Sequence, residues 1–569
     1  MLARQRAALP ENVPGQKHQK HSQADGDEGE GRRRIRRQCV HSVWQPIIAH
    51  NGCVFRRHFL PLLLCLPACT SYGPVDVVEF SAQDAQVAMA SGTLLSRTLT
   101  QSYLDRIARV DDAGPMLNAV IEVNPAALAE ADARDAERAA GHVRGPLHGI
   151  PVLLKDNIDV AGLVNSAGSL ALATHRPAKD AFLVTQLREA GAVILGKTNL
   201  SEWANFRSTR SSSGWSSRGG QTKNPYALDR NPCGSSSGTG AAIAASLGAI
   251  GVGTETDGSI ICPASVNGLV GLKPTVGLVS RGGIIPISIS QDTAGPMGRT
   301  VSDVAMLLSA IAVVDDADPA GPASADHRPS DYTAFLLSDA LRGKRIGVLR
   351  QAMGYHPDVD AVMASAIDAV RKLGAEVVDV KIATYNQWND PEFEVLLYEF
   401  KDGLNSYLKS SGAPVASLEA LMAWNTANAA EAMPIFGQEI FVQAQAKGSL
   451  TDAAYQKARD DARRLAGKDG LIAAMDQLTL DAVIAPSMSP AWTTDHVLGD
   501  HFVGAGYGVA AVAGTPSLTV PAGDVAGLPV GVTWMGRAWS EADLISFAYT
   551  FEQATQARRA PRFMNGLRR

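Results

Sequence analysis

The sequence has few cysteines, few aromatic residues and little charge. It holds six Cys among 569 residues, 6% aromatic residues and 19% charged residues. So few cysteines exclude a fold that depends on a dense disulfide framework. A formal net charge of −5 gives no electrostatic reason to expect a nucleic-acid partner, and we expect none. What is present, 46% hydrophobic residues over this length, is enough to bury a large core, as in ordinary globular enzymes.

The first 69 residues do not resemble part of a fold. Residues 1–53 mix Gln, His, Arg, Glu and Gly without helical or strand periodicity, so we expect a disordered or mis-annotated extension. Arg56 and Arg57 then precede the apolar run from Phe59 to Leu66, which is too short to span a bilayer. This pattern predicts a secretory signal over residues 54–69.

The signal ends in a box that is typical of bacterial lipoproteins. Leu66, Pro67 and Ala68 precede Cys69, although Pro67 departs from the usual pattern. We therefore expect an exported protein, periplasmic or anchored by lipid at Cys69, with a cytoplasmic location as the alternative. Because the signal pattern begins at Val54, we also predict that Val54 is the true initiator.

Only two cysteines belong to the part that should fold. Cys39, Cys53, Cys65 and Cys69 lie in the leader, which leaves Cys233 and Cys262. Two cysteines without a cluster of partners make no zinc site, and we expect no metal. The pair fits two small buried residues, and it also fits a disulfide formed in an oxidising compartment.

Strand and helix patterns alternate along the rest of the chain. Residues 149–154 are typical of a strand, 182–190 of a helix closed by Gly191, and 192–195 of another strand. The same order recurs over 241–253 and over 345–380. It predicts an α/β fold with a large mixed, mostly parallel central β-sheet covered by helices on both faces.

We expect a single domain over residues 76–569. Helical composition dominates residues 394–464, which indicates a helical elaboration of that domain. Apolar strand patterns at 481–485, 517–520 and 530–535 then return the chain to the sheet.

Three polar or glycine-rich loops carry the candidate chemistry. One follows a strand and holds Lys155, the second runs from Cys233 to Gly240 before a helix, and the third runs from Gly253 to Ile260 after a strand. Reactive groups are commonly displayed at such strand and helix ends. Each loop alone would be unremarkable, as a surface lysine or a Gly/Ser linker, and the combination is what indicates an enzyme.

Residues 234–238 also fit the Gly-x-Ser-x-Gly nucleophile elbow. In an α/β-hydrolase this would make Ser236 the nucleophile, with Asp495 and His496 as candidate partners. The elbow must join a strand directly to a helix, whereas Pro225 and Pro232 make the preceding residues a loop. This hypothesis is therefore the weaker alternative.

The complete set of motifs resembles the amidase signature family. The similarity covers Gly149 to Asp156, the Gly-Ser-Ser-Ser-Gly run, Gly253 to Pro263, Gly268 to Thr275 and Ser290 to Pro296, in order and with matching spacing. The resemblance implies the amidase signature fold and a hydrolase acting on carbon–nitrogen bonds in linear amides, with no cofactor. It places the nucleophile on Ser259, the bridging serine after a cis peptide bond on Ser235, and the lysine on Lys155.

The chemistry of amide hydrolysis explains such a trio. The hydroxyl of Ser259 must lose a proton as it attacks, and the amine leaving group must gain one. A lysine can accept that proton only where burial lowers its pKa from about 10.4 by several units. Ser235 can accept from one group and donate to the other, so it can pass the proton between Lys155 and Ser259.

The loop that leads into Ser259 resembles the family's oxyanion hole. Its donors would be the backbone N–H groups of Thr256, Asp257, Gly258 and Ser259. The family more often has Gly at the position of Asp257 and Arg at that of Ile261, so recognition of an acidic group by that Arg is not expected here. Asp292 could orient the network or merely cap a loop.

Further motifs are similar to the bacterial peptide amidases, among them Ser201 to Phe206 and Tyr398 to Lys401. This resemblance implies a small-molecule or peptide amide substrate. Trp203, Phe206 and Trp215 could line its side-chain pocket or could belong to the core. The alternatives are a general aliphatic or aryl amidase, a non-catalytic binding protein and a transamidation subunit. The oligomeric state stays open.

Overall fold

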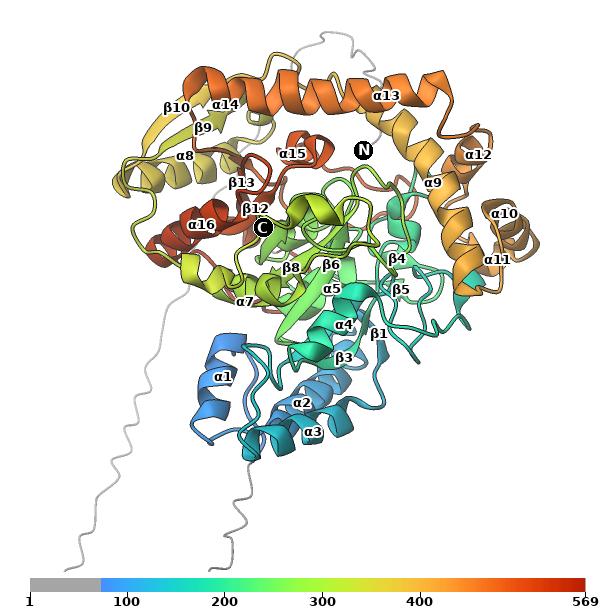
Figure 1. Ribbon diagram of the computed structural model, residues 1–569, viewed down its shortest axis with the longest axis vertical. Helices are drawn as coiled ribbons and strands as arrows, with labels where there is room; N and C mark the ends of the chain where they lie inside the picture. The colour runs from blue at the N-terminus through green and yellow to red at the C-terminus, as the bar shows by residue number, and fades with distance from the viewer. Residues whose placement is uncertain (1–72, 568–569) are drawn as a thin grey trace, which may run out of the picture. The chain divides into compact units, whose positions relative to one another are not determined.

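An eleven-stranded mixed sheet runs through the computed structural model, which describes residues 73–567 (Figure 1). Its strands lie in the order β1-β3-β2-β6-β8-β7-β12-β13-β11-β9-β10, and β4 pairs with β5 in a separate two-stranded ribbon. The strands are β1 (Val120–Val123), β2 (Pro151–Lys155), β3 (Val193–Thr198), β4 (Trp215–Ser216), β5 (Gly220–Gln221), β6 (Ile250–Glu255), β7 (Val270–Lys273), β8 (Thr293–Gly298), β9 (Arg345–Leu349), β10 (Glu376–Val380), β11 (Ala482–Pro486), β12 (Ser517–Val525) and β13 (Leu528–Met535).

The predicted mixed sheet is confirmed, but parallel pairing is confined to its two flanks. Within residues 73–567 the parallel pairs are β2 with β3 and β6, and β9 with β10 and β11. From β6 through β8, β7, β12 and β13 to β11 every neighbouring pair is antiparallel, as is β1 with β3. The sheet is thus less parallel than predicted, because strand–helix–strand units supply only the flanks and direct antiparallel connections such as β12–β13 supply the centre.

Helices pack on this sheet and extend beyond it. α5 contacts β6 and β8, while α8 and α16 contact β12. The helices are α1 (Ala82–Ala90), α2 (Ser96–Arg106), α3 (Ala127–Ala139), α4 (Phe182–Glu189), α5 (Ser237–Ala244), α6 (Ile261–Val266), α7 (Val301–Ile311), α8 (Pro357–Lys372), α9 (Asn389–Ser411), α10 (Leu418–Ala427), α11 (Ala429–Ala432), α12 (Glu439–Gln445), α13 (Ala453–Arg463), α14 (Ile472–Leu478), α15 (Gly508–Ala513) and α16 (Glu541–Thr555).

Local sequence explains several element ends. The Ser81 side chain accepts a hydrogen bond from the Asp84 amide and so caps α1. After α4 the chain turns at Gly191, whose φ is +82° and where a Cβ would lie 2.6 Å from the His148 ring. Glycine is needed there both for the backbone conformation and for the close approach.

Residues 389–463 form the helices α9 to α13. α9 packs along α13 and α12, as Figure 1 shows in yellow and orange. A buried apolar cluster joins α9 and α12 to the segment around Trp203 and Phe206. These helices are therefore held against the loops that follow β3, close to the residues discussed below.

The predicted leader lies outside the described residues. The extension over residues 1–53, the signal over 54–69, the start at Val54 and the lipid site at Cys69 all stay predictions. Within residues 73–567, no helix combines the length and the apolar character that a bilayer crossing requires.

Candidate active site

The three loops singled out in the sequence meet at one edge of the sheet. β2 and β6 are parallel neighbours, with Leu154 opposite Val252. Their carboxyl ends therefore place Lys155 and Thr254 side by side. The residues before α5 bring Ser235 to the same place.

Lys155 is completely buried, and its amine has three polar neighbours. Nζ lies 2.7 Å from Ser235 Oγ, 2.8 Å from Thr254 Oγ1 and 3.1 Å from the Thr254 carbonyl oxygen. A neutral amine has two N–H groups and one lone pair. When both N–H groups donate to the oxygens of Thr254, the lone pair is left for the hydroxyl proton of Ser235.

Burial also allows the amine of Lys155 to lose its proton near neutral pH. Loss of hydration lowers the pKa of Lys155 from 10.5 to about 7, against the opposing charges of Asp292 and Glu255. A buried lysine with such a pKa can act as a base without a histidine.

The loop of Ser235 is fastened to the loop of Ser259. The peptide bond between Gly234 and Ser235 is cis, as the family resemblance implied. The Ser236 amide donates to the Ser259 carbonyl oxygen at 3.2 Å, and a disulfide joins Cys233 to Cys262. The question of the two cysteines, which the sequence left open, is thus answered by a bridge between the two serine loops.

The hydrogen bonds of the Ser236 side chain do not fit the role of a nucleophile in an elbow. Its Oγ donates to the Thr254 carbonyl oxygen at 3.1 Å and accepts from the Thr254 amide at 3.2 Å. Residues 231–236, which precede α5, contain no strand. His496 contacts Gln221, and Asp495 accepts from the Val497 amide. The α/β-hydrolase interpretation of Ser236 is therefore wrong, because the strand that would present the serine is missing there.

Backbone amides without partners surround Ser259. The Glu255 carboxylate accepts from the amides of Ile260 and Ile261 at 2.7 and 2.9 Å, and the Gly258 amide also helps to lower its pKa, which burial raises. The amides of Thr256, Asp257 and Ser259 donate to no group among residues 73–567. Unpaired N–H groups on one short loop are rare, and they are what an oxyanion hole requires.

Gly258 lets this loop pass under an aromatic ring. Its φ is +80°, and a Cβ at this position would lie 2.1 Å from the Tyr507 ring. Only glycine fits both conditions.

Asp292 holds the loop of Thr256 in place, and its negative charge acts on Lys155. Its Oδ1 accepts from Thr256 Oγ1 at 2.6 Å, and Oδ2 accepts from the amides of Ile287 and Ser288 at 2.8 and 2.9 Å. Burial raises the pKa of Asp292 to about 6. Of the two roles weighed from the sequence, the loop cap is observed, and the orienting role in the serine–lysine network stays a prediction.

A cavity of about 330 Å³ opens beside these residues. Its lining includes Ser235, Thr254, Thr256 and Asp292, the apolar residues 284–287 and polar residues of α9. Among residues 73–567 no group of three or more His, Cys, Asp or Glu side chains is placed to hold a metal ion.

The three aromatic residues predicted to line a substrate pocket do not line this cavity and pack against other aromatic rings. Trp203 packs edge-on against Phe441, and Phe206 packs 5.0 Å from Phe400 between ring centres. Trp215 packs against Phe436. The cavity wall in this segment is Ala204 instead. Contact of these rings with substrate stays a prediction that this cavity does not support.

Comparison with known proteins agrees with this geometry. The family model described as Amidase matches residues 98–545. The chain belongs to the amidase signature family.

A probable amidase of Arabidopsis thaliana is 40% identical over 511 residues, covering 86% of this chain and 92% of its own. The crystal structure of native peptide amidase from Stenotrophomonas maltophilia is 55% identical with a TM-score of 0.83, covering 85% of this chain and 99% of its own. One subunit of the glutamyl-tRNA(Gln) amidotransferase of Roseiflexus castenholzii is 36% identical over 492 residues, covering 84% of this chain and 96% of its own.

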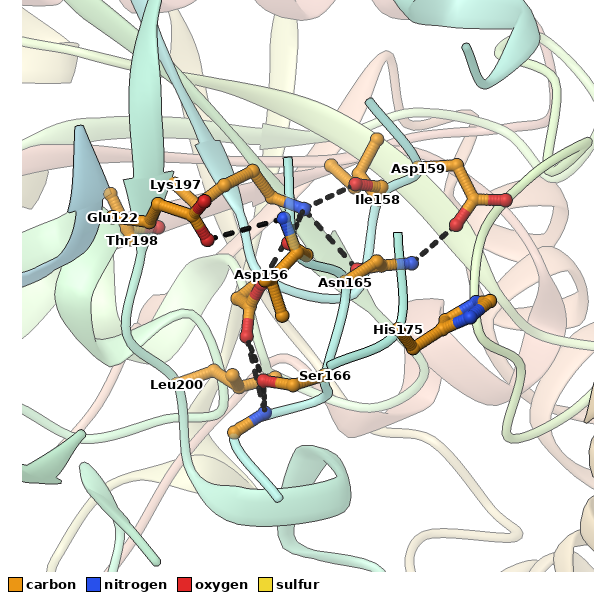
Figure 2. Close-up of polar contacts among 12 residues, drawn as sticks. Glu122, Asp156, Ile158, Asp159, Asn165, Ser166, His175, Lys197, Thr198 and Leu200 are labelled. Atoms are coloured by element: carbon orange, nitrogen blue, oxygen red, sulfur yellow. Dashed lines mark hydrogen bonds and ion pairs between the residues drawn. The ribbon is translucent and has the colours of Figure 1, made fainter. Parts of the chain in front are cut away.

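The amidase is thus a hydrolase of carbon–nitrogen bonds in amides, with a fold that matches known members of the family. In this amidase a buried network also fixes the residues next to Lys155, as Figure 2 shows. Asp156 lies 3.5 Å from Lys197 Nζ, accepts from the Ser166 hydroxyl and pairs with Arg218 at 3.1 Å. Lys197 in turn donates to the Ile158 carbonyl oxygen at 2.5 Å. The turn that follows Lys155 is therefore held from both sides.

Two residues near the amine were not assigned a role from the sequence. Thr254 supplies two acceptors to Lys155, and Asn157 Nδ2 donates to Thr254 Oγ1 at 3.0 Å. Both are polar residues at the carboxyl end of a buried strand, which is the signal that could have found them.

Proposed function

We propose that this amidase releases ammonia from the carboxyl-terminal amides of peptides through an acyl-enzyme on Ser259. The observation that carries the proposal is the buried Lys155 amine, whose two N–H groups can be satisfied by Thr254 while its lone pair faces Ser235. Such an amine is a base aimed at one hydroxyl.

In the proposed reaction the proton moves through two hydroxyl groups. Ser259 Oγ attacks the amide carbon and gives its proton to Ser235, which passes its own to Lys155. The negative oxygen of the tetrahedral intermediate is bound by the free amides of Thr256, Asp257 and Ser259. The proton returns through Ser235 to the amide nitrogen, the carbon–nitrogen bond breaks and ammonia leaves. Water then cleaves the ester by the same path and yields the carboxylic acid.

The peptide amide is proposed because of the similarity to a solved peptide amidase. At 55% identity that protein aligns with this chain over 99% of its length. The cavity beside Ser235 is lined by the apolar residues 284–287 together with polar and charged side chains, and such a mixed lining suits an amide joined to a side chain.

A substrate panel tests the proposal. Ammonia release should be fastest from N-acylated dipeptide amides, slower from free amino-acid amides and slowest from simple aliphatic or aryl amides, and internal peptide bonds should stay intact. The Ser259→Ala variant should release no ammonia while its circular dichroism matches that of the parent. Equal rates across the panel would favour a general amidase.

A transamidation subunit is the second candidate, because subunits of glutamyl-tRNA(Gln) amidotransferases are among the relatives, one of them at 36% identity. Such a subunit would release ammonia from glutamine. Turnover of glutamine that exceeds that of the peptide amides would favour this candidate.

For location we propose export, with lipid at Cys69 or release into the periplasm. The buried disulfide between Cys233 and Cys262 supports an oxidising compartment. Mass spectrometry of the protein from fractionated cells should find a mature N-terminus near residue 69. A full-length chain in the cytoplasm would contradict this proposal.

A further inference from the structure

The disulfide joins the two loops that carry Ser235 and Ser259. Cys233 lies two residues before Ser235, and Cys262 lies three residues after Ser259. The Cα atoms of the two cysteines are 6.0 Å apart, and both side chains are buried. No other covalent link connects these two loops within residues 73–567.

We infer that the Cys233–Cys262 bond is a positioning device, which holds the hydroxyl of Ser235 within reach of that of Ser259, and that opening it slows acylation. This inference rests on the proposed function, in which the proton must pass between those two hydroxyls. Neither sulfur takes part in the reaction itself.

The lysine base and the two serines of the proton path are held very differently. Lys155 and Thr254 belong to adjacent paired strands, so the sheet fixes their distance. Ser235 and Ser259 lie on irregular loops outside the strands. A displacement of about 1 Å in such a contact can reduce the rate about 100-fold.

Besides the two hydrogen bonds between Ser236 and Thr254 near the end of β6, two further bonds join the residues around Ser235 to those that follow the oxyanion loop. The Ser236 amide donates to the Ser259 carbonyl oxygen at 3.2 Å. Asn267, just after α6, donates to the Pro232 carbonyl oxygen at 2.9 Å. Such hydrogen bonds can lengthen or break when the loops move, whereas a disulfide keeps the two Cα atoms within about 4.4–6.8 Å of each other.

The backbone at Cys233 also needs restraint. Its φ is +56°, a left-handed conformation that disfavours residues with a Cβ. The Asn231 side chain holds the Cys233 amide at 2.8 Å, and the disulfide holds its side chain. Without the bridge this residue can relax toward negative φ and carry Ser235 with it.

The test uses the double variant Cys233→Ala with Cys262→Ala, assayed on a peptide amide well below its unfolding temperature. We expect kcat to fall about tenfold or more, with KM within about twofold of the parent. The pH at which the rate rises to half its plateau should not change, because burial, Asp292 and Glu255 set the pKa of Lys155 and the disulfide does not. A merely structural bridge would lower Tm and leave kcat of the folded enzyme unaltered, and that result would overturn the inference.

Reversible reduction of the parent provides a second arm, which also covers a double variant that does not fold. Dithiothreitol cleaves the S–S bond to two thiols and is itself oxidised to its cyclic disulfide. Loss of kcat that tracks the appearance of two titratable thiols, and its recovery on reoxidation, is expected. Full activity of the reduced, folded enzyme would contradict the inference. The outcome is separate from that for the proposed function, because an active Ser259→Ala variant would remove Ser259 from its role whatever the state of the disulfide.

Discussion

Thr254 offers Lys155 two acceptors at once, its hydroxyl oxygen at 2.8 Å and its carbonyl oxygen at 3.1 Å from Nζ. We predict that Thr254→Val lowers kcat about 10- to 100-fold, in line with the ~1–3 kcal/mol that an unpaired buried donor costs. Valine keeps the shape but leaves one amine N–H unpaired, so the lone pair is no longer directed at Ser235. Thr254→Ser retains the hydroxyl and should stay near the parent rate. A valine variant as active as the serine variant would refute this role.

The pH dependence follows from the buried amine. Since burial lowers the pKa of Lys155 to about 7, the neutral base becomes more abundant as pH rises, and kcat/KM should increase through pH 7 and then level off. Lys155→Arg should be inactive at every pH, because a guanidinium group keeps its proton. Steady-state rates across about pH 5–9 provide the measurement. A rate that falls through this range would exclude Lys155 as the base.

The lowered pKa of Lys155 also makes the stability of the fold depend on pH. Lys155 binds a proton in the unfolded chain up to its ordinary pKa of 10.5 but loses it in the fold near 7. The unfolded state therefore binds more protons between these values, so this group's contribution to stability increases with pH across that window.

The charge of Asp292 should influence the pH at which kcat/KM rises, which we call the acid limb of the pH profile. Its negative charge raises the pKa of Lys155, so Asp292→Asn is expected to lower that pKa and move the limb to lower pH. The amide can still accept from the amides of Ile287 and Ser288 and donate to Thr256, which preserves the loop. Asp292→Ala removes the brace as well and should also lower kcat. An asparagine variant whose limb moves to higher pH would contradict the assigned charge effect.

Sequence patterns located the reactive loops but not their connections. β9 and β10 lie at the two ends of the predicted strand–helix–strand stretch 345–380, where β-branched residues are frequent. β8 was not recognised, because Thr293–Gly298 is rich in Gly and Pro and resembles a loop until its neighbours pair with it. The alternation of strands and helices suggested more parallel pairing than the central strands adopt.

For the candidate site, too, the sequence indicated the reactive residues but not which residues lie beside them in the fold. Lys155, Ser235 and Ser259 stood out by motif, whereas the position of Thr254 beside the amine depends on the register between β2 and β6. The disulfide spans 29 positions between two loops, and no local pattern indicates that they meet. Trp203 was indistinguishable from a pocket residue until its packing against Phe441 was known.

Glu399 should be important for stability, because it ties α9 to the loop that carries Asp292. Its carboxylate accepts from the Ser288 hydroxyl, from the amide and hydroxyl of Ser290, and from the Tyr455 hydroxyl, at 2.5–2.9 Å. Glu399→Gln leaves too few acceptors for these donors and should destabilise the fold by about 2–3 kcal/mol. Denaturant unfolding measures the effect.

Glu394→Gln is the matched control for that change on the same helix. Glu394 pairs with Lys447 at 2.6 Å in a partly exposed position, so its loss should cost less than about 1 kcal/mol. If the two variants lose equal stability, Glu399 has no special bracing role.

The most direct test is to trap the acyl-enzyme. Rapid acid quenching of the amidase with an N-acylated peptide amide, followed by proteolysis and mass spectrometry, should find the acyl group on Ser259, with one ammonia released per acyl group formed. Prior substitution Ser259→Ala should abolish the adduct. An acyl group on Ser236, or ammonia release without any adduct in repeated early quenches, would contradict the account.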